Sequence, residues 1–285
     1  MARKKRGGGG RQRARQRQQY DELDKYPVMP PHAFARIVRD KQTLNIIYQI
    51  IEPPLTKKEQ EQRDEIMDIF IRSLTANIEE IDSNPEAYVR TAMDKVIKSY
   101  SMKINKKSKS KLFYYLRRDL IGYGKMDVLM NDVNVEDISL DGTNVPIFAY
   151  HRKFESVETT CVWETDEELE SYVIKLAQRC GKHISVAEPL LDATLMDGSR
   201  IVMKLGHEIS TRGSAFCIRR FKDDPFSPAD IVAFRTMSSL MVAYLWIAFQ
   251  NEVPMLFVGG TASGKTTTLN AMCIFIPWQM KIVSI

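Results

Sequence analysis

The sequence has few cysteines and histidines, and it lacks a long apolar run. Its four cysteines lie far apart with no C-x-x-C pair, and its four histidines show no H-E-x-x-H or other ligand spacing. This pattern disfavours a structural zinc site or a disulfide framework and favours reduced thiols. The longest nearly unbroken apolar run covers residues 240–249, whereas a membrane-spanning helix needs about 20 such residues. We therefore expect no structural metal and no membrane span.

The N-terminus is basic but has no apolar segment behind its charges. The first 19 residues contain eight Arg or Lys and no acid, so the net charge of +5 is a property of this tail. Without an apolar segment it cannot serve as a secretory signal peptide, and we expect a cytoplasmic protein. We predict that residues 1–20 form a disordered arm. This arm either contacts nucleic acid or anionic lipid, or simply keeps the chain soluble.

Residues 21–111 are predicted to be mainly helical. The sequence "TKKE" has capping-box spacing, so a helix should begin at Thr56. A second helix should be capped by Asn84 with Pro85 in its first position. Its apolar stripe is predicted to consist of Tyr88, Ala92, Val96 and Tyr100. The lysine-rich stretch at residues 103–111 is interpreted as a charged loop.

Residues 112–221 are predicted to form an α/β domain. Short strand-like runs include "PIFAY" and "CVWE", and a helix is expected between "TDEE" and "CGK". The period-two runs "RIVMKL" and "SAFCIRRF" predict two paired strands between residues 199 and 221. Residues 222–229 are polar and contain proline, which is typical of a linker. Residues 230–285 are predicted to be a further, partial domain.

The strongest motif is the glycine-rich stretch "GGTASGKTTT". Its residues satisfy G-x-x-x-x-G-K-[ST], between an apolar run at 255–259 that predicts a strand and a run that predicts a helix. Such a loop points backbone N–H groups at the phosphates of ATP, with a lysine for the β and γ phosphates and a hydroxyl for Mg²⁺. The metal ligand would be Thr266. The predicted nucleotide-binding residues are Gly259, Gly260, Thr261, Ala262, Ser263, Gly264, Lys265, Thr266 and Thr267.

No carboxylate follows this loop. Residues 265–285 contain neither Asp nor Glu, and the terminal "KIVSI" is interpreted as a β-strand. Hydrolysis of ATP requires a carboxylate that holds the metal-bound water and a group that positions the attacking water. We therefore expect that the nucleotide-binding sheet is cut off partway and that the chain is truncated.

The chain resembles the archaeal secretion ATPases of the type II and type IV secretion superfamily, which include pilus-assembly and archaellum motor ATPases. The resemblance rests on "GGTASGKTTTLNA", "YYLRRDLIGYGKMDVLMNDVNVEDISLDG", "LAQRCGKHISVAEPLLDATLMDGSRI" and "GSAFCIRRF". It implies an α/β fold, in which a helical and α/β N-terminal region precedes the first part of a RecA-like P-loop NTPase domain. It also implies a homo-hexameric ring at the cytoplasmic face of the cell membrane. There the ring would work with a polytopic platform protein and filament assembly machinery.

The resemblance also implies catalytic roles for Lys265 and Thr266, and for arginines of the N-terminal domain that reach the nucleotide phosphates. By motif position the candidate arginines are Arg200, Arg212, Arg219 and Arg220. Because neighbouring residues of a strand face opposite sides, at most one of the adjacent pair can point at the nucleotide. The Walker B segment, acidic box and histidine box of the family are missing, so we expect this chain alone to be inactive as an ATPase.

These sequence features are compatible with three functions. The first is an ATP-driven motor subunit for assembly or rotation of a secretion or pilus-like filament. The second is a non-catalytic remnant that binds nucleotide or a partner, which the missing carboxylates favour. The third is a conjugation-type ATPase linked to nucleic acid, which the basic tail suggests.

Overall fold

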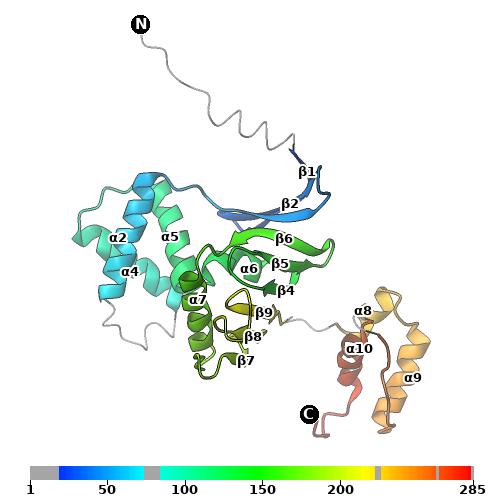
Figure 1. Ribbon diagram of the computed structural model, residues 1–285. Helices are drawn as coiled ribbons and strands as arrows, with labels where there is room; N and C mark the ends of the chain where they lie inside the picture. Colours follow the sequence, from blue (N-terminus) through cyan, green and yellow to red (C-terminus); the bar gives the residue numbers. More distant parts are fainter. Residues whose placement is uncertain (1–18, 74–83, 222–225, 261–262, 284–285) are drawn as a thin grey trace. The chain divides into compact units, whose positions relative to one another are not determined.

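The computed structural model describes residues 19–73, 84–221, 226–260 and 263–283. It divides into two compact units, residues 1–221 and residues 222–285, and each is described by itself (Figure 1). The arm predicted for residues 1–20 lies almost entirely outside the described residues, as do residues 222–225 of the predicted linker.

A nine-stranded sheet forms the centre of the N-terminal unit, and its strand order is β1-β2-β3-β6-β5-β4-β9-β8-β7 (Figure 1). Neighbouring strands are antiparallel, except that β3 and β6 pair in parallel through Ile47 and Tyr48. The strands are β1 (Tyr20–Met29), β2 (Ala33–Asp40), β3 (Ile46–Ile51), β4 (Val135–Leu140), β5 (Pro146–His151), β6 (Glu155–Val162), β7 (Leu190–Thr194), β8 (Arg200–Lys204) and β9 (Ala215–Arg219). The chain is therefore a mixed α/β protein, and the predicted pairing of β8 with β9 is confirmed.

Three strands lie within the region that the sequence predicted to be mainly helical. Strands β1 to β3 form an antiparallel meander at one edge of the sheet, so the prediction for residues 21–111 was wrong in this part. In β2 the buried side chains of Ala33, Ala35 and Ile37 alternate with less buried ones, which is the period of a strand with one covered face. Short alanine-containing runs of this kind carry a weak strand signal, and the partner strands decide their structure.

Three helices pack around a second, smaller core in the N-terminal unit. They are α2 (Lys57–Ser73), α4 (Pro85–Ser99) and α5 (Lys106–Leu120), and their contact is made by Ile66, Phe70, Val89, Met93, Val96, Leu112 and Leu116. The predicted caps are confirmed: Thr56 and Glu59 bond reciprocally, and the Asn84 side chain accepts from the Ala87 N–H. Three residues of the predicted stripe of α4 face this core, because Val96 is buried and Tyr88 and Ala92 pack against it half-buried. Tyr100 is exposed, and Val89 and Met93 are buried in addition.

Helix α5 replaces most of the charged loop predicted for residues 103–111, so that prediction was wrong. The Asn105 side chain accepts from the Ser108 N–H and caps the helix. Leu112 and Leu116 then recur at helical spacing and are fully buried. Burial of this apolar face outweighs the lysines in the first turns.

The largest core lies against the sheet. Helix α7 (Asp166–Arg179) lies where the sequence predicted a helix, and it contributes its buried side chains Leu169, Val173, Leu176 and Ala177 to this core. The short η1 (Gly124–Met126) and α6 (Asp127–Asn131) contribute Met126, Leu129 and Met130. This core fixes strands β8 and β9, which carry two of the four candidate arginines, Arg200 and Arg219.

All regular secondary structure in the described part of the C-terminal unit is helical. It contains α8 (Pro228–Ala233), α9 (Ser239–Gln250), α10 (Lys265–Met272) and the single turn η2 (Cys273–Phe275), packed around Ile231, Val242, Ala271 and Met272. The predicted strand at 255–259 is not formed, and neither is the one predicted at the end of the chain in its described residues, 281–283. A strand needs a hydrogen-bonded neighbour, and none pairs with these segments in the described part of this unit. No helix in the described parts of the chain is long and apolar enough to cross a bilayer.

Candidate functional site

The glycine-rich loop leads directly into α10. Gly264 caps this helix with a left-handed backbone (φ 81°), and no side chain satisfies the N–H groups of the first turn. A left-handed residue favours glycine because a Cβ would be strained there. The start of α10 therefore combines free N–H donors with the positive end of the helix dipole, which suits an anion.

Two side chains of the described part of the loop donate hydrogen bonds to the same backbone oxygen, the Gly260 carbonyl. The Ser263 hydroxyl donates to this oxygen at 2.8 Å, and the Lys265 ammonium donates to it as well. A Cβ on Gly259 would lie 2.5 Å from the Ser263 hydroxyl oxygen, so a larger residue there would force this hydroxyl away from its position. Lys265 thus folds back over its own loop. Thr261 and Ala262, two of the predicted binding residues, lie outside the described residues.

Three consecutive threonines at the start of α10 differ in exposure. Thr266 is exposed, Thr267 is half-buried and Thr268 is buried. The exposed Thr266 hydroxyl is therefore free of core packing, as a metal ligand must be. Among the described residues, no group of three or more His, Cys, Asp or Glu side chains could hold a metal ion. The loop fits a phosphate chain, and its metal would reach the protein chiefly through Thr266.

Arg200 and Arg219 lie directly opposite each other on β8 and β9. Their side chains are 70% and 80% exposed. Each is held by one aspartate: Arg200 contacts Asp192 at 2.7 Å, and Arg219 contacts Asp137 at 3.3 Å. The hydrogen bond from Arg200 lowers the pKa of Asp192. Like charges opposite one another repel, and the two aspartates offset this repulsion.

The other two candidate arginines are placed differently. Arg220 is half-buried, and its guanidinium donates to the backbone carbonyls of Asp132 and Val135. Arg212 is exposed in the loop between β8 and β9, at the opposite end of this strand pair from Arg200 and Arg219. The structure therefore brings together two of the four candidates.

Two polar clusters in the N-terminal unit were not found by sequence reasoning. In one, Asp166 at the start of α7 accepts hydrogen bonds from the Thr143 hydroxyl and, at 3.1 Å, from His207. It joins three loops, including the one that carries Arg212. The other is the buried carboxylate of Asp132, which accepts from two tyrosine hydroxyls. The partners are far apart in the chain, so no local pattern could reveal either cluster.

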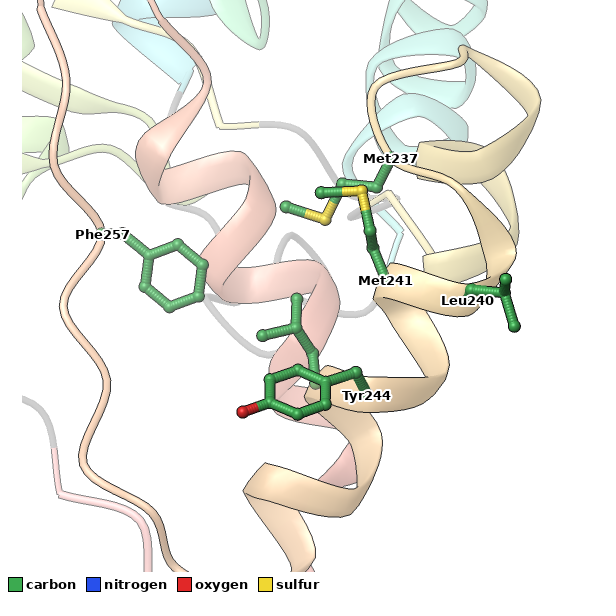
Figure 2. Close-up of a pocket in the computed structure, with 6 residues that line it drawn as sticks. Met237, Leu240, Met241, Tyr244 and Phe257 are labelled. Atoms are coloured by element: carbon green, nitrogen blue, oxygen red, sulfur yellow. The ribbon is translucent and has the colours of Figure 1, made fainter.

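An apolar pocket of about 410 Å³ lies beside α9 in the C-terminal unit. Figure 2 shows the side chains of Met237 and Met241 next to each other, with Tyr244 and Phe257 along the wall. The remaining lining residues are Leu240 and Leu245. None of these residues belongs to the glycine-rich loop. With almost no polar lining, this pocket does not suit a phosphate chain.

No protein-family model matches the chain. Two relatives from Methanocaldococcus jannaschii are both described as uncharacterized proteins. MJ1288 is 42% identical over 164 residues, which cover 57% of this chain and 65% of the relative. MJ0900 is 33% identical over 264 residues, which cover 91% of this chain and 47% of the relative. The chain thus spans between about half and two-thirds of the length of these relatives.

Two solved structures are similar to parts of the chain. The VirB11 ATPase from the Brucella suis type IV secretion system, in complex with sulphate, is 20% identical, with a TM-score of 0.30 and 54% of each chain covered. The Legionella pneumophila ATPase DotB is 16% identical, with a TM-score of 0.29, and the match covers 50% of this chain and 38% of DotB. At these TM-scores the likeness supports no conclusion about the activity of this chain.

Proposed function

We propose that this chain is an ATP-binding subunit of a secretion or type IV pilus-like motor, in which ATP hydrolysis drives filament assembly or rotation. The proposal rests on the sequence G-x-x-x-x-G-K-T at the start of α10. Gly264 has a left-handed backbone conformation there, and no side chain caps the N–H groups of the first turn. Sequence, backbone conformation and helix dipole all favour a phosphate chain at this point. The RecA-like character of the C-terminal unit belongs to the same proposal.

Different groups of the loop would bind different parts of Mg²⁺-ATP. Backbone N–H groups of the loop and the first turn of α10 would surround the β phosphate. Lys265 would leave the Gly260 carbonyl, which it contacts in this structure, and donate to the β and γ phosphates. The Thr266 hydroxyl would hold Mg²⁺, which neutralises charge on the phosphates.

Arg200 and Arg219 are the better placed of the four candidate arginines. Both are exposed on one face of the sheet, and their bonds to Asp192 and Asp137 are exposed ion pairs of small net stability. A phosphate could therefore replace an aspartate at low cost. Arg220 instead donates to backbone carbonyls. We assign it to the support of β4, and we leave Arg212 as a separate candidate.

The partners of the motor follow from the family resemblance of the sequence. They are further copies of the chain in a hexameric ring, a polytopic membrane platform protein, and the filament assembly machinery. We also propose that the basic N-terminal tail contacts anionic lipid or nucleic acid.

Binding of a fluorescent ATP analogue with Mg²⁺ tests the site. Replacement of Lys265 by Ala should weaken binding by at least about tenfold, since a charge-assisted bond to phosphate is worth roughly 1.5–3 kcal/mol. The matched control is Lys281→Ala, an exposed lysine of the same unit, and it should bind normally. Equal affinities of both variants and the parent chain would contradict the proposed site.

A second candidate function is nucleotide binding without hydrolysis. It is favoured by the lack, among the described residues, of any group of three or more His, Cys, Asp or Glu side chains that could hold a metal ion, because hydrolysis needs a carboxylate near the metal. Measurement of phosphate release separates the two functions. Turnover that is lost in Lys265→Ala supports the motor, whereas tight binding without turnover supports the second candidate.

A further inference from the structure

The corner where α4 ends and α5 begins carries an unusual concentration of positive charge. Residues 95–111 contain seven lysines and no acidic residue. Five of these lysines are exposed, and Tyr100 is 58% exposed between them. We call this surface the basic corner, and it consists of Lys95, Lys98, Tyr100, Lys103, Lys106 and Lys107.

The five exposed lysines are not paired within the described part of the chain. The other two lysines are engaged: Lys109 contacts Asp94 at 2.6 Å, and Lys111 contacts Glu59 at 3.5 Å. In contrast, no described acidic side chain forms an ion pair with any lysine of the basic corner. The local charges are therefore free to meet an external anion.

Two of the lysines lie where they disfavour the helix. Lys106 and Lys107 occupy the first turn of α5, which contains no acid. A cation at this end of a helix is opposed by the helix dipole, and lysines three or four positions apart repel one another. Burial of Leu112 and Leu116 outweighs this cost, but no ion pair among the described residues relieves it at Lys106 or Lys107. Charges that the fold does not need point to a function outside it.

The backbone on both sides of the basic corner is anchored. Buried Met93 and Val96 of α4 and Leu112 of α5 belong to one core, and the ion pair of Lys109 with Asp94 ties the two helices together. The lysines of both helices are therefore presented from one packed support.

We propose that the basic corner binds the surface of an anionic lipid bilayer. Lysine is a compact, strongly hydrated charge that suits diffuse attraction to lipid headgroups, and tyrosine prefers the membrane–water interface. Nucleic-acid surfaces use arginine for bidentate contacts and several aromatic rings for stacking. Residues 91–116 contain no arginine, and Tyr100 is the only ring of the basic corner. The surface would seat the N-terminal unit against a membrane independently of nucleotide binding.

Sedimentation of the full chain with phosphatidylcholine vesicles, with and without phosphatidylglycerol, tests this proposal. The test variant is Lys103→Gln/Lys106→Gln/Lys107→Gln. The matched control is Lys25→Gln/Lys182→Gln/Lys204→Gln, which removes the same charge from exposed positions of the sheet and the end of α7. Both variants keep the basic N-terminal tail, so its contribution is equal in the two chains.

Each lysine near an anionic bilayer contributes roughly a fivefold factor in binding. The test variant should therefore bind phosphatidylglycerol vesicles at least about tenfold more weakly than the control, with an unchanged thermal unfolding midpoint. Equal binding of the two variants, or no binding of the parent chain, would overturn the proposal. So would a tenfold loss of duplex DNA binding in the test variant with vesicle binding intact, because the partner would then be nucleic acid.

Discussion

Glu59 shows how a single side chain can fix the start of a helix. Its carboxylate accepts from the Ser108 hydroxyl of α5 at 2.6 Å and from the Thr56 N–H at 2.8 Å. These bonds, the one from Ser108 foremost, lower the pKa of Glu59 from 4.5 to about 2. The residue therefore joins a capping box in α2 to the neighbouring helix.

We predict a pH-dependent cost for Glu59→Gln. A lowered pKa in the folded state means that the charged carboxylate stabilises the fold above about pH 4.5, and that this stability is lost as the pH falls toward about 2. At pH 7 the variant should be less stable by about 1 kcal/mol or more. Urea unfolding at several pH values measures this. The exposed Glu61→Gln on the same helix should change stability by less than about 0.5 kcal/mol, and a cost for Glu59→Gln that is independent of pH would contradict the account.

The buried carboxylate of Asp132 supports a second prediction at this scale. The fully buried Tyr48 donates its hydroxyl to the Asp132 carboxylate at 2.6 Å. Tyr48→Phe keeps the ring and removes one donor to a buried charge, so it should lower the free energy of unfolding by roughly 1.5–3 kcal/mol. Tyr150→Phe, at an exposed position of β5, is the control and should stay within about 0.5 kcal/mol of the parent chain. Similar urea midpoints for the two variants would show that the hydrogen bond has little effect.

At the scale of elements, local signals predicted the helix starts better than the strands. Thr56 and Asn84 cap their helices as the sequence suggested, because a cap depends on residues within one turn. Helix α5 was missed because its lysines resemble a loop, although the cap Asn105 and the spacing of Leu112 and Leu116 were present.

Strands β1 to β3 pair with one another as a meander, and β3 joins the rest of the sheet by pairing with β6, which lies far along the chain. A single segment does not contain that information. The same limit applies to the candidate site: its loop could be read from consecutive residues, whereas the ion pairs of Arg200 and Arg219 could not.

The loop between β4 and β5 makes a close backbone approach that yields a third prediction. Gly142 has φ 130°, and a Cβ there would lie 2.2 Å from the Arg212 carbonyl oxygen. Gly181 also has a positive φ, of 67°, but a Cβ there would meet nothing. Gly181→Ala should therefore cost about 1–2 kcal/mol for backbone strain alone, and Gly142→Ala should cost clearly more because the loop that carries Arg212 must move. Urea midpoints compare the two variants, and an equal loss would argue against this tight contact.

At the scale of the whole molecule, the two units differ in how well they bury apolar side chains. The N-terminal unit has a continuous core against its sheet. In the C-terminal unit, α9 has no charged residue, and Leu240 and Tyr244 are 81% and 73% exposed. A helix that is apolar all round is normally covered. The proposed motor would bring other protein surfaces near this helix.

We propose that the glycine-rich loop holds the phosphates of ATP. Hydrogen–deuterium exchange of the full chain, with and without Mg²⁺-ATP, is the sharpest test because it reports on the backbone N–H groups themselves. We expect slower exchange in peptides that cover residues 259–267, and no such protection in Lys265→Ala. Unchanged exchange in these peptides at saturating nucleotide, or protection that persists in Lys265→Ala, would contradict it.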